Sequence, residues 1–170
     1  MPPRQPFTRH RKRLEKELVD VQSGTLGATE HISIAPDDEL DLTRWTVQLR
    51  PERGSLYDGG TFVLSVVVGD RYPIEPPNFQ FVTPVCHPNV HPKTGVICLD
   101  VLGEKWSPAS TLHASALAIL MLLDAPDPTS PLNCDAGNLL RSGDLRAYNS
   151  LVRVHTSLHA ARTAAGAAPR

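Results

Sequence analysis

Residues 84–109 form a long segment in the middle of the chain that has no helical or strand periodicity, and this segment constrains the fold most. Prolines and glycines interrupt it: Pro84, Pro88, Pro92, Gly95, Gly103 and Pro108. Each proline removes a backbone donor and fixes φ, so regular structure cannot run through the segment. A long irregular segment inside a compact domain is usually functional. We therefore expect the chemistry of the protein here.

The segment carries one nucleophile and one amide. Cys98 follows a turn at Gly95, and Asn89 stands between two prolines upstream. A thiolate is a strong nucleophile, and an amide N–H can stabilise the oxyanion that forms when an acyl group moves. The pair indicates acyl transfer through a thioester. The alternatives are a buried structural thiol and a turn asparagine.

The flanking sequence predicts an α+β fold. An amphipathic helix is expected over 7–21, and alternating or apolar runs predict strands at 31–35, 45–49, 61–68 and 78–83. Short turns between these strands favour an antiparallel meander. Three helices follow at 111–123, 135–141 and 144–160. The first is apolar nearly all round and is expected to be buried; the third is expected to turn five residues inward, Leu145, Tyr148, Leu151, Val152 and Val154.

Composition indicates one intracellular domain. The 170 residues fit a single core over 7–160, with a disordered tail at 1–6 and a flexible Ala-rich tail at 161–170. A formal net charge of -1 does not favour nucleic-acid binding, and no apolar run is long enough to span a bilayer. Three cysteines do not suggest a secreted disulfide framework. We expect a cytoplasmic protein that would need a partner to hold it at a membrane.

The order of elements and motifs resembles the ubiquitin-conjugating enzymes from about residue 7 to residue 159. The resemblance rests on motifs in the family's order: His87-Pro88-Asn89, Cys98, Trp106-Ser107-Pro108, Tyr72-Pro73 with Pro76-Pro77, and Tyr57-Asp58-Gly59-Gly60. It implies the ubiquitin-conjugating fold, a four-stranded antiparallel meander flanked by an N-terminal helix and three C-terminal helices.

A finer resemblance is to the peroxin members of this family, which ubiquitinate the peroxisomal import receptor. The gap from Asn89 to Cys98 is one residue longer than in most of the family. The segments 41–45, 130–132, 137–144 and 147–148 are also similar to that branch.

The resemblance implies roles for the site residues. Cys98 would form the thioester, and Asn89 would steady the loop and stabilise the oxyanion. His87 would fix the loop by hydrogen bonds rather than act as a base. Cys86, His87, His91 and Cys98 fit no standard zinc spacing, and a metal would consume the nucleophile, so we predict no metal site.

One position departs from many family members. They carry an acidic residue just before a Pro-Leu pair, which helps to deprotonate the incoming lysine, whereas this chain has Ser130 before Pro131-Leu132. Asp127 could supply charge nearby, although a solvated loop aspartate is the simpler interpretation. The departure would suit an acceptor that needs less deprotonation, such as the cysteine associated with the peroxin branch.

Two further cysteines, Cys86 and Cys134, belong to segments that flank the active-site region in this fold. They suggest a regulatory disulfide, which requires Cα atoms within about 7 Å. The alternative is two buried reduced thiols.

The resemblance also places partner contacts. The basic first helix would meet the ubiquitin-activating enzyme, through Arg9, Lys12, Arg13 and Lys16. Two loops would contact RING-type ligases, through Ile74, Pro108 and Ala109. Ile74 replaces the phenylalanine common there, so ligase choice should differ.

The sequence therefore predicts an enzyme that moves ubiquitin from the activating enzyme to Cys98 and on to a substrate. No cofactor is needed, because ATP is consumed one step earlier. The peroxin branch implies a membrane-anchored peroxin recruiter, the import receptor as substrate, and a position at the cytosolic face of the peroxisomal membrane. The alternatives are a non-catalytic binding module, an enzyme for a ubiquitin-like modifier, and a general degradation pathway.

Overall fold

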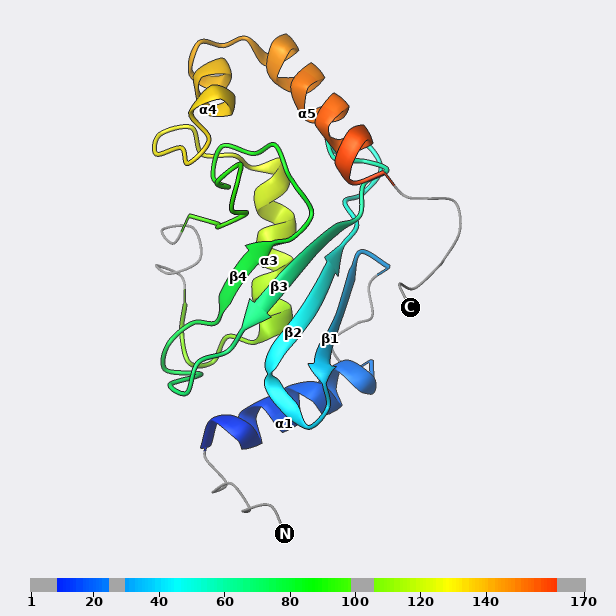
Figure 1. Cartoon of the computed structure of the whole chain (residues 1–170), viewed down its shortest axis with the longest axis vertical. Helices are drawn as coiled ribbons and strands as arrows, with labels where there is room; N and C mark the ends of the chain where they lie inside the picture. The colour runs from blue at the N-terminus through cyan, green and yellow to red at the C-terminus, as the bar shows by residue number, and fades with distance from the viewer. Residues whose placement is uncertain (1–8, 25–29, 99–105, 162–170) are drawn as a thin grey trace.

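The computed structural model describes residues 9–24, 30–98 and 106–161. Within them, helix α1 (Arg9–Gln22) precedes four strands, β1 (Ile32–Asp38), β2 (Asp41–Leu49), β3 (Phe62–Val67) and β4 (Asn78–Phe81). Three helices follow, α3 (Leu112–Asp124), α4 (Cys134–Arg141) and α5 (Leu145–His159). Figure 1 shows α1 at one end of the molecule and α4 with α5 at the other, with the sheet between them. The predicted α+β order of elements is confirmed.

The sheet is an antiparallel meander in the order β1-β2-β3-β4, as predicted. Alternate residues of β2 point into the core, so that Trp45, Val47 and Leu49 are buried between exposed or half-buried neighbours. Leu49 pairs with Phe62 of β3, which continues the same buried face across the sheet. This period-two burial is what one packed face of a sheet requires.

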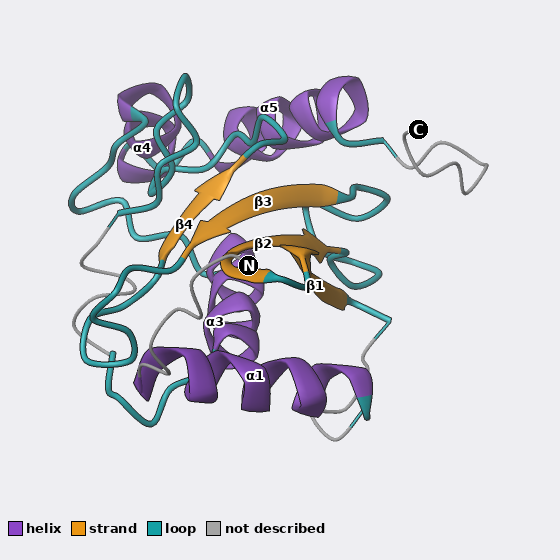
Figure 2. Cartoon of the chain, turned by 60° about the horizontal axis from the view of Figure 1, so that its bottom comes forward, coloured by secondary structure: helices purple, strands orange, loops and turns teal. Residues whose placement is uncertain are grey.

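Helix α3 lies across one face of the sheet, and α1 runs beneath its end (Figure 2). The buried side of α3 supplies Leu112, Ala116, Ile119 and Leu123 to the core. From α1, Leu14 is buried, while Leu18 and Val21 pack partly buried against the same core. The predicted apolar stripe of the first helix is therefore confirmed.

Two expectations about helix burial are wrong. Helix α3 is not buried all round, because it packs on one face and leaves Leu117 and Met121 exposed on the other. In α5, Tyr148 and Val152 are buried as predicted. Leu145, Leu151 and Val154 point outward instead, with exposed fractions of 57%, 39% and 57%. A helix at the end of the molecule contacts few neighbours, so it buries only a narrow stripe.

The predicted tails fall mostly outside the described residues. Residues 1–8 and 162–170 are not described, so the disorder expected at 1–6 and beyond 161 remains a prediction. Ala161 itself is described and forms an isolated bridge with Gly60, while Ala160 O accepts from Thr61 N at 2.8 Å. The end of α5 is thus attached to the start of β3.

Candidate active site

The segment that carries Cys98 is held against the edge of the sheet by backbone hydrogen bonds. Phe81 N donates to Gly95 O at 2.9 Å, and His91 N donates to Val96 O at 2.8 Å. Cys98 N donates to Asn89 O at 2.9 Å, next to an isolated bridge between Val90 and Ile97. The two residues predicted to carry the chemistry are therefore brought together, although nine positions separate them.

Gly95 makes this close approach possible. Its φ is +73°, a conformation that L side chains rarely adopt, and an added Cβ would lie 2.0 Å from Phe81 O. The turn at Gly95, within the lengthened gap between Asn89 and Cys98, therefore needs glycine on two independent grounds. Without that turn, residues 95 and 96 could not pair with the edge of β4.

His87 is fully buried and makes two hydrogen bonds. Its Nε2 donates to Leu122 O at 3.0 Å, and its Nδ1 accepts from Asn89 N at 3.1 Å. This pattern requires the neutral tautomer protonated at Nε2. Burial lowers the pKa of His87 to about 4, although the bond to Leu122 opposes the shift. The bonds support the predicted loop-fixing role rather than that of a base.

The Asn89 side chain is 2% exposed and makes a paired contact with the backbone N–H and C=O of one residue of the following loop, Asp127. Its Nδ2 donates to Asp127 O at 2.8 Å, and its Oδ1 accepts from Asp127 N at 2.9 Å. Pro88 O accepts from Leu132 N and Asn133 N in the same region. Asn89 thus holds the loop at 125–132 against the active-site segment. Its part in stabilising an oxyanion stays a prediction.

Cys98 is partly exposed, and two of the residues predicted to support the active site, Ser130 and Asp127, lie on the neighbouring loop. Ser130 is exposed on the loop that Asn89 holds. Asp127 is also exposed, and its Oδ1 accepts from the Thr129 hydroxyl at 2.6 Å and from Thr129 N at 2.8 Å. These bonds lower the pKa of Asp127. A carboxylate that is harder to protonate than usual is a weaker proton acceptor.

The cysteine pair is not joined in the structure. Cys86 is buried and Cys134 is exposed at the start of α4, and each is a free thiol. The alternative of two buried thiols is therefore wrong for Cys134. Burial raises the pKa of the Cys86 thiol to about 11, and the nearby Asp135 adds to the shift. A thiol in this state is a poor nucleophile. The disulfide itself stays a hypothesis.

The residues predicted to meet protein partners lie near α1. Lys12 and Lys16 lie one turn apart on α1, and both are exposed. The predicted ligase contacts on the two neighbouring loops are exposed as well: Ile74, Pro108 and Ala109. Arg9 opens α1, but its side chain is not described.

Arg13, by contrast, turns inward. Its Nε lies 2.6 Å from Glu17 Oε1, and its Nη2 donates to Ser110 O at 2.7 Å. Sequence reasoning missed Glu17. The available signal was its position among Leu14, Leu18 and Val21, which places a carboxylate on the apolar stripe of the helix.

In the described ranges no three His, Cys, Asp or Glu side chains are grouped so that they could hold a metal ion. No helix in the described part of the chain is both long and apolar enough to cross a membrane.

Comparison with known proteins shows the family to which the chain belongs. The family model for the ubiquitin-conjugating enzyme matches residues 13–156. The chain belongs to the ubiquitin-conjugating enzyme family, and it is a transferase of that class.

Relatives that are similar to most of this chain include proteins named peroxin 4. Protein PEROXIN-4 of Arabidopsis thaliana is 46% identical over 150 residues, covering 88% of this chain and 94% of that protein. Ubiquitin-conjugating enzyme E2 pex4 of Dictyostelium discoideum is 44% identical over 147 residues, covering 86% of this chain and 97% of that protein. Among solved structures, H. polymorpha Pex4p, crystallised with the soluble domain of Pex22p, has a TM-score of 0.83 and 32% identity. That match covers 91% of this chain and all of the other (100%).

Proposed function

We propose that ubiquitin is carried as a thioester on Cys98 and is passed from there, with a RING-type ligase, to the peroxisomal import receptor. The observation that carries the proposal is the junction of Cys98 and Asn89, where a residue with a partly exposed thiol is held by a backbone hydrogen bond to the buried Asn89. The family membership supports ubiquitin as the group transferred, and the peroxin relatives support the receptor as its destination.

In the transfer, the thiolate of Cys98 attacks the carbonyl of the ubiquitin C-terminus on the activating enzyme. The carbonyl carbon becomes tetrahedral as the new S–C bond forms, and its oxyanion then collapses and breaks the bond to the activating enzyme's sulfur, whose thiolate takes up a proton. The acceptor loses its proton, attacks the same carbonyl and releases the Cys98 thiolate, which takes up a proton in turn. The side-chain nitrogen of Asn89 carries two hydrogens, and one of them is donated to Asp127 O. To stabilise the oxyanion, the second hydrogen must face the oxygen of the reacting carbonyl.

Charging tests this step. The protein is incubated with ubiquitin-activating enzyme, ATP and ubiquitin, and the products are separated without reducing agent. We expect an adduct that thiol removes, that the Cys98→Ala variant does not form, and that the Cys98→Ser variant forms in a thiol-resistant state. Parallel reactions use ubiquitin-like modifiers with their own activating enzymes. Charging by one of those instead of ubiquitin would overturn the choice of modifier.

The acceptor is a thiol in this proposal. A lysine amine has an ordinary pKa of about 10.4 and a cysteine thiol one of about 8.5, so the amine needs more help to lose its proton. This chain offers Ser130 where a carboxylate would give that help, and the pKa of the neighbouring Asp127 is lowered by its bonds to Thr129. A serine at position 130 and a weakened proton acceptor at Asp127 favour the acceptor that ionises more readily.

A single substitution tests the acceptor. Ser130→Asp should speed the discharge of ubiquitin from Cys98 to a lysine peptide and leave discharge to a matching cysteine peptide unchanged. The matched control is Ser130→Asn, which has nearly the same size and shape as Asp at the same exposed position but carries no charge. An equal effect of Ser130→Asp on both peptides would contradict the proposal.

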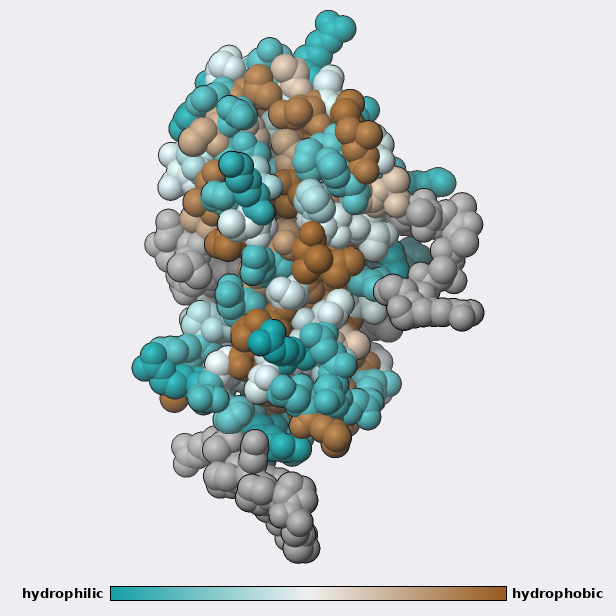
Figure 3. Space-filling model, in the orientation of Figure 1, coloured by the Kyte–Doolittle hydropathy of each residue, from teal (hydrophilic) through white to brown (hydrophobic). Residues whose placement is uncertain are grey.

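A membrane-anchored peroxin would recruit the protein to the peroxisome, and the proposed docking surface is the outer face of α5. Leu151, Val154 and Leu158 form an exposed apolar stripe there, with exposed fractions of 39%, 57% and 72%. Figure 3 shows hydrophobic residues gathered over this end of the molecule. Exposed apolar patches of this kind mark interaction sites. The complex of the H. polymorpha relative with Pex22p supports a recruiter of that type.

Binding to a purified Pex22-like soluble domain tests this surface. Val154→Asp should abolish binding, because it places a charge in the centre of the stripe. Val19→Asp on α1 is the control, since Val19 is exposed to a similar extent, 59%. Equal binding by the two variants would place the recruiter elsewhere.

A further inference from the structure

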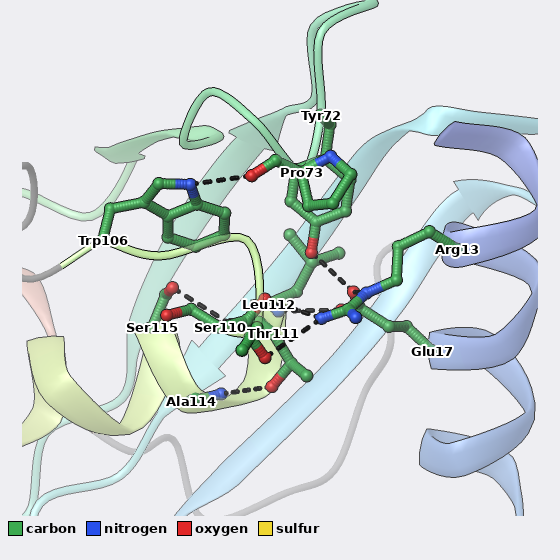
Figure 4. Close-up of polar contacts among 11 residues, drawn as sticks. Arg13, Glu17, Tyr72, Pro73, Trp106, Ser110, Thr111, Leu112, Ala114 and Ser115 are labelled. Carbon is green, nitrogen blue, oxygen red and sulfur yellow. Dashed lines mark hydrogen bonds and ion pairs between the residues drawn. The ribbon is translucent and has the colours of Figure 1, made fainter. Parts of the chain in front are cut away.

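Glu17 is a buried carboxylate that the transfer chemistry does not use. It lies on the inner face of α1, is 3% exposed, and accepts hydrogen bonds from three separate parts of the chain (Figure 4). Its Oε1 accepts from Arg13 Nε at 2.6 Å and from the Tyr72 hydroxyl at 2.5 Å. Its Oε2 accepts from Leu112 N at 2.8 Å. One side chain therefore links α1, the loop at 72–75 and the start of α3.

The partners of Glu17 extend these links. Arg13 Nη2 donates to Ser110 O at 2.7 Å and to Ala109 O at 3.3 Å, so the same ion pair reaches the loop at 106–110. Trp106 Nε1 donates to Pro73 O at 3.0 Å, and its ring lies 5.7 Å from that of Tyr72. The two loops thus contact each other as well as Glu17. Figure 4 shows these side chains converging between α1 and the start of α3.

The donors explain why an ionised group is tolerated here. Burying a carboxylate is costly unless it is paired and its oxygens are hydrogen-bonded. Glu17 has an arginine partner and two further donors, a hydroxyl and a backbone N–H. Burial and the bond to Glu17 raise the pKa of Tyr72, so its hydroxyl keeps its proton and remains a donor at all ordinary pH values.

We propose that Glu17 is the positioning residue for ligase docking, fixing the two loops that present Ile74, Pro108 and Ala109 relative to α1. This inference rests on the proposed function, which assigns those three residues to the ligase. Ile74 follows Pro73, whose carbonyl binds Trp106. Pro108 and Ala109 lie between Trp106 and the Ser110 carbonyl that binds Arg13. Glu17 therefore acts through its neighbours, and its loss should impair ligase binding while the reaction at Cys98 continues.

Single-turnover discharge separates these two effects. The protein is charged with ubiquitin, ATP is then hydrolysed with apyrase, and transfer to hydroxylamine is followed at increasing concentrations of a RING domain. The RING domain is chosen from a panel because it stimulates the wild-type protein. Glu17→Gln keeps the shape of the side chain, removes its charge and turns an NH2 group toward a donor.

The expected result is a split between binding and chemistry. Glu17→Gln should raise the RING concentration that gives half-maximal stimulation by roughly tenfold, within the range of typical coupling between sites. The unstimulated rate should stay within about twofold of wild type, since Cys98 is untouched. Tyr72→Phe, which removes one of the three bonds, should give a smaller shift in the same direction.

The matched control is Glu15→Gln. Glu15 forms the same i,i+4 pair with Arg11, at 3.0 Å, but is 42% exposed and contacts no loop through that pair. Glu15→Gln should change neither the RING concentration that gives half-maximal stimulation nor the unstimulated rate. Half-saturation at the wild-type concentration in Glu17→Gln would overturn the proposal, and so would equal losses in the unstimulated and stimulated rates.

Two other outcomes are distinguishable. If Glu17→Gln does not fold, Tyr72→Phe decides by the same split, with an unchanged half-saturation overturning the proposal. If the wild-type protein does not charge, or no RING domain stimulates it, the proposed function fails and this inference fails with it.

Discussion

The two ends of this molecule hold irregular segments in place by different chemistry. At the active-site end, the Asn89 amide makes a neutral, paired contact with the backbone of Asp127. At the α1 end, Glu17 and Arg13 form a buried ion pair that contacts two loops. Both contacts attach irregular loops to the rest of the fold. The active-site end is held by the neutral amide of Asn89, and the α1 end is held by the charged pair of Glu17 and Arg13.

The difference follows from what each end does in the proposed function. A fixed charge beside Cys98 would act on the thiolate and on the oxyanion of every transfer, because electrostatic effects are strong where water is excluded. The neutral His87 and Asn89 hold that end without such a charge. The α1 end performs no chemistry, so it can use the stronger, charge-assisted hydrogen bonds.

The largest expected effect contrasts the two ion pairs of α1. Glu17→Ala should lower the free energy of unfolding by about 3–5 kcal/mol, because it leaves Arg13 and two other donors without their buried acceptor. Glu15→Ala, which breaks the exposed pair with Arg11, should cost about 0.5 kcal/mol or less. Urea denaturation of both variants measures the difference. Equal losses would show that burial of Glu17 contributes nothing, and the contrast between the ends would fail.

The next effect is the pH dependence of His87. Its folded pKa of about 4 lies below the ordinary value of about 6.5, so between these values the unfolded chain binds more protons. The stability it contributes is complete above about pH 6.5 and is lost as the pH falls toward 4, by roughly 3 kcal/mol.

Denaturation of wild type and His87→Gln across this range tests the assignment. The variant should show the shallower dependence. Some slope should remain, because burial also lowers the pKa of His113 and His155. Parallel curves for the two proteins would contradict a neutral, buried His87.

A third prediction concerns the turn beside Cys98. Gly95→Ala should destabilise the protein by up to about 3 kcal/mol more than Gly143→Ala, because its Cβ would overlap Phe81 O. Gly143 is the matched control, with a φ of +76° against +73° and nothing within 4 Å of an added Cβ. Thermal unfolding measures both variants. Equal shifts would mean that only backbone conformation, and not the close approach, requires glycine at 95.

The smallest expected effect is at Asn89. Asn89→Ala removes both bonds to the Asp127 backbone and should cost about 2 kcal/mol of stability. Asn138→Ala is the control, since Asn138 is exposed on α4 and should change stability by less than about 0.5 kcal/mol. Guanidinium denaturation compares them. If Asn89→Ala is as stable as wild type but transfers ubiquitin slowly, the residue serves the oxyanion and not the loop.

The sequence predicted those features whose causes are local. The alternation of Trp45, Val47 and Leu49 repeats every two residues, so the pattern itself identifies the buried face of β2. The sequence also indicated that Cys98 and Asn89 are presented together, and a backbone hydrogen bond joins them.

Features that depend on distant packing could not be predicted. Glu17 meets Tyr72 and Leu112, which are 55 and 95 positions away, so its pattern gave no sign of its partners. Leu151 and Val154 were expected inside because they are apolar. They lie outside because α5 has too few neighbours to cover them.

The most direct test asks which of the three cysteines carries ubiquitin. Cys134 is more exposed than Cys98, and Cys86 is buried, so accessibility alone would favour Cys134. Intact-mass spectrometry of the charged protein is compared for wild type and the three single Cys→Ser variants, before and after thiol treatment. Our account predicts a thiol-sensitive addition of one ubiquitin in Cys86→Ser and Cys134→Ser, and a thiol-resistant one in Cys98→Ser. A thiol-sensitive adduct that persists in Cys98→Ser and disappears in Cys134→Ser would contradict it.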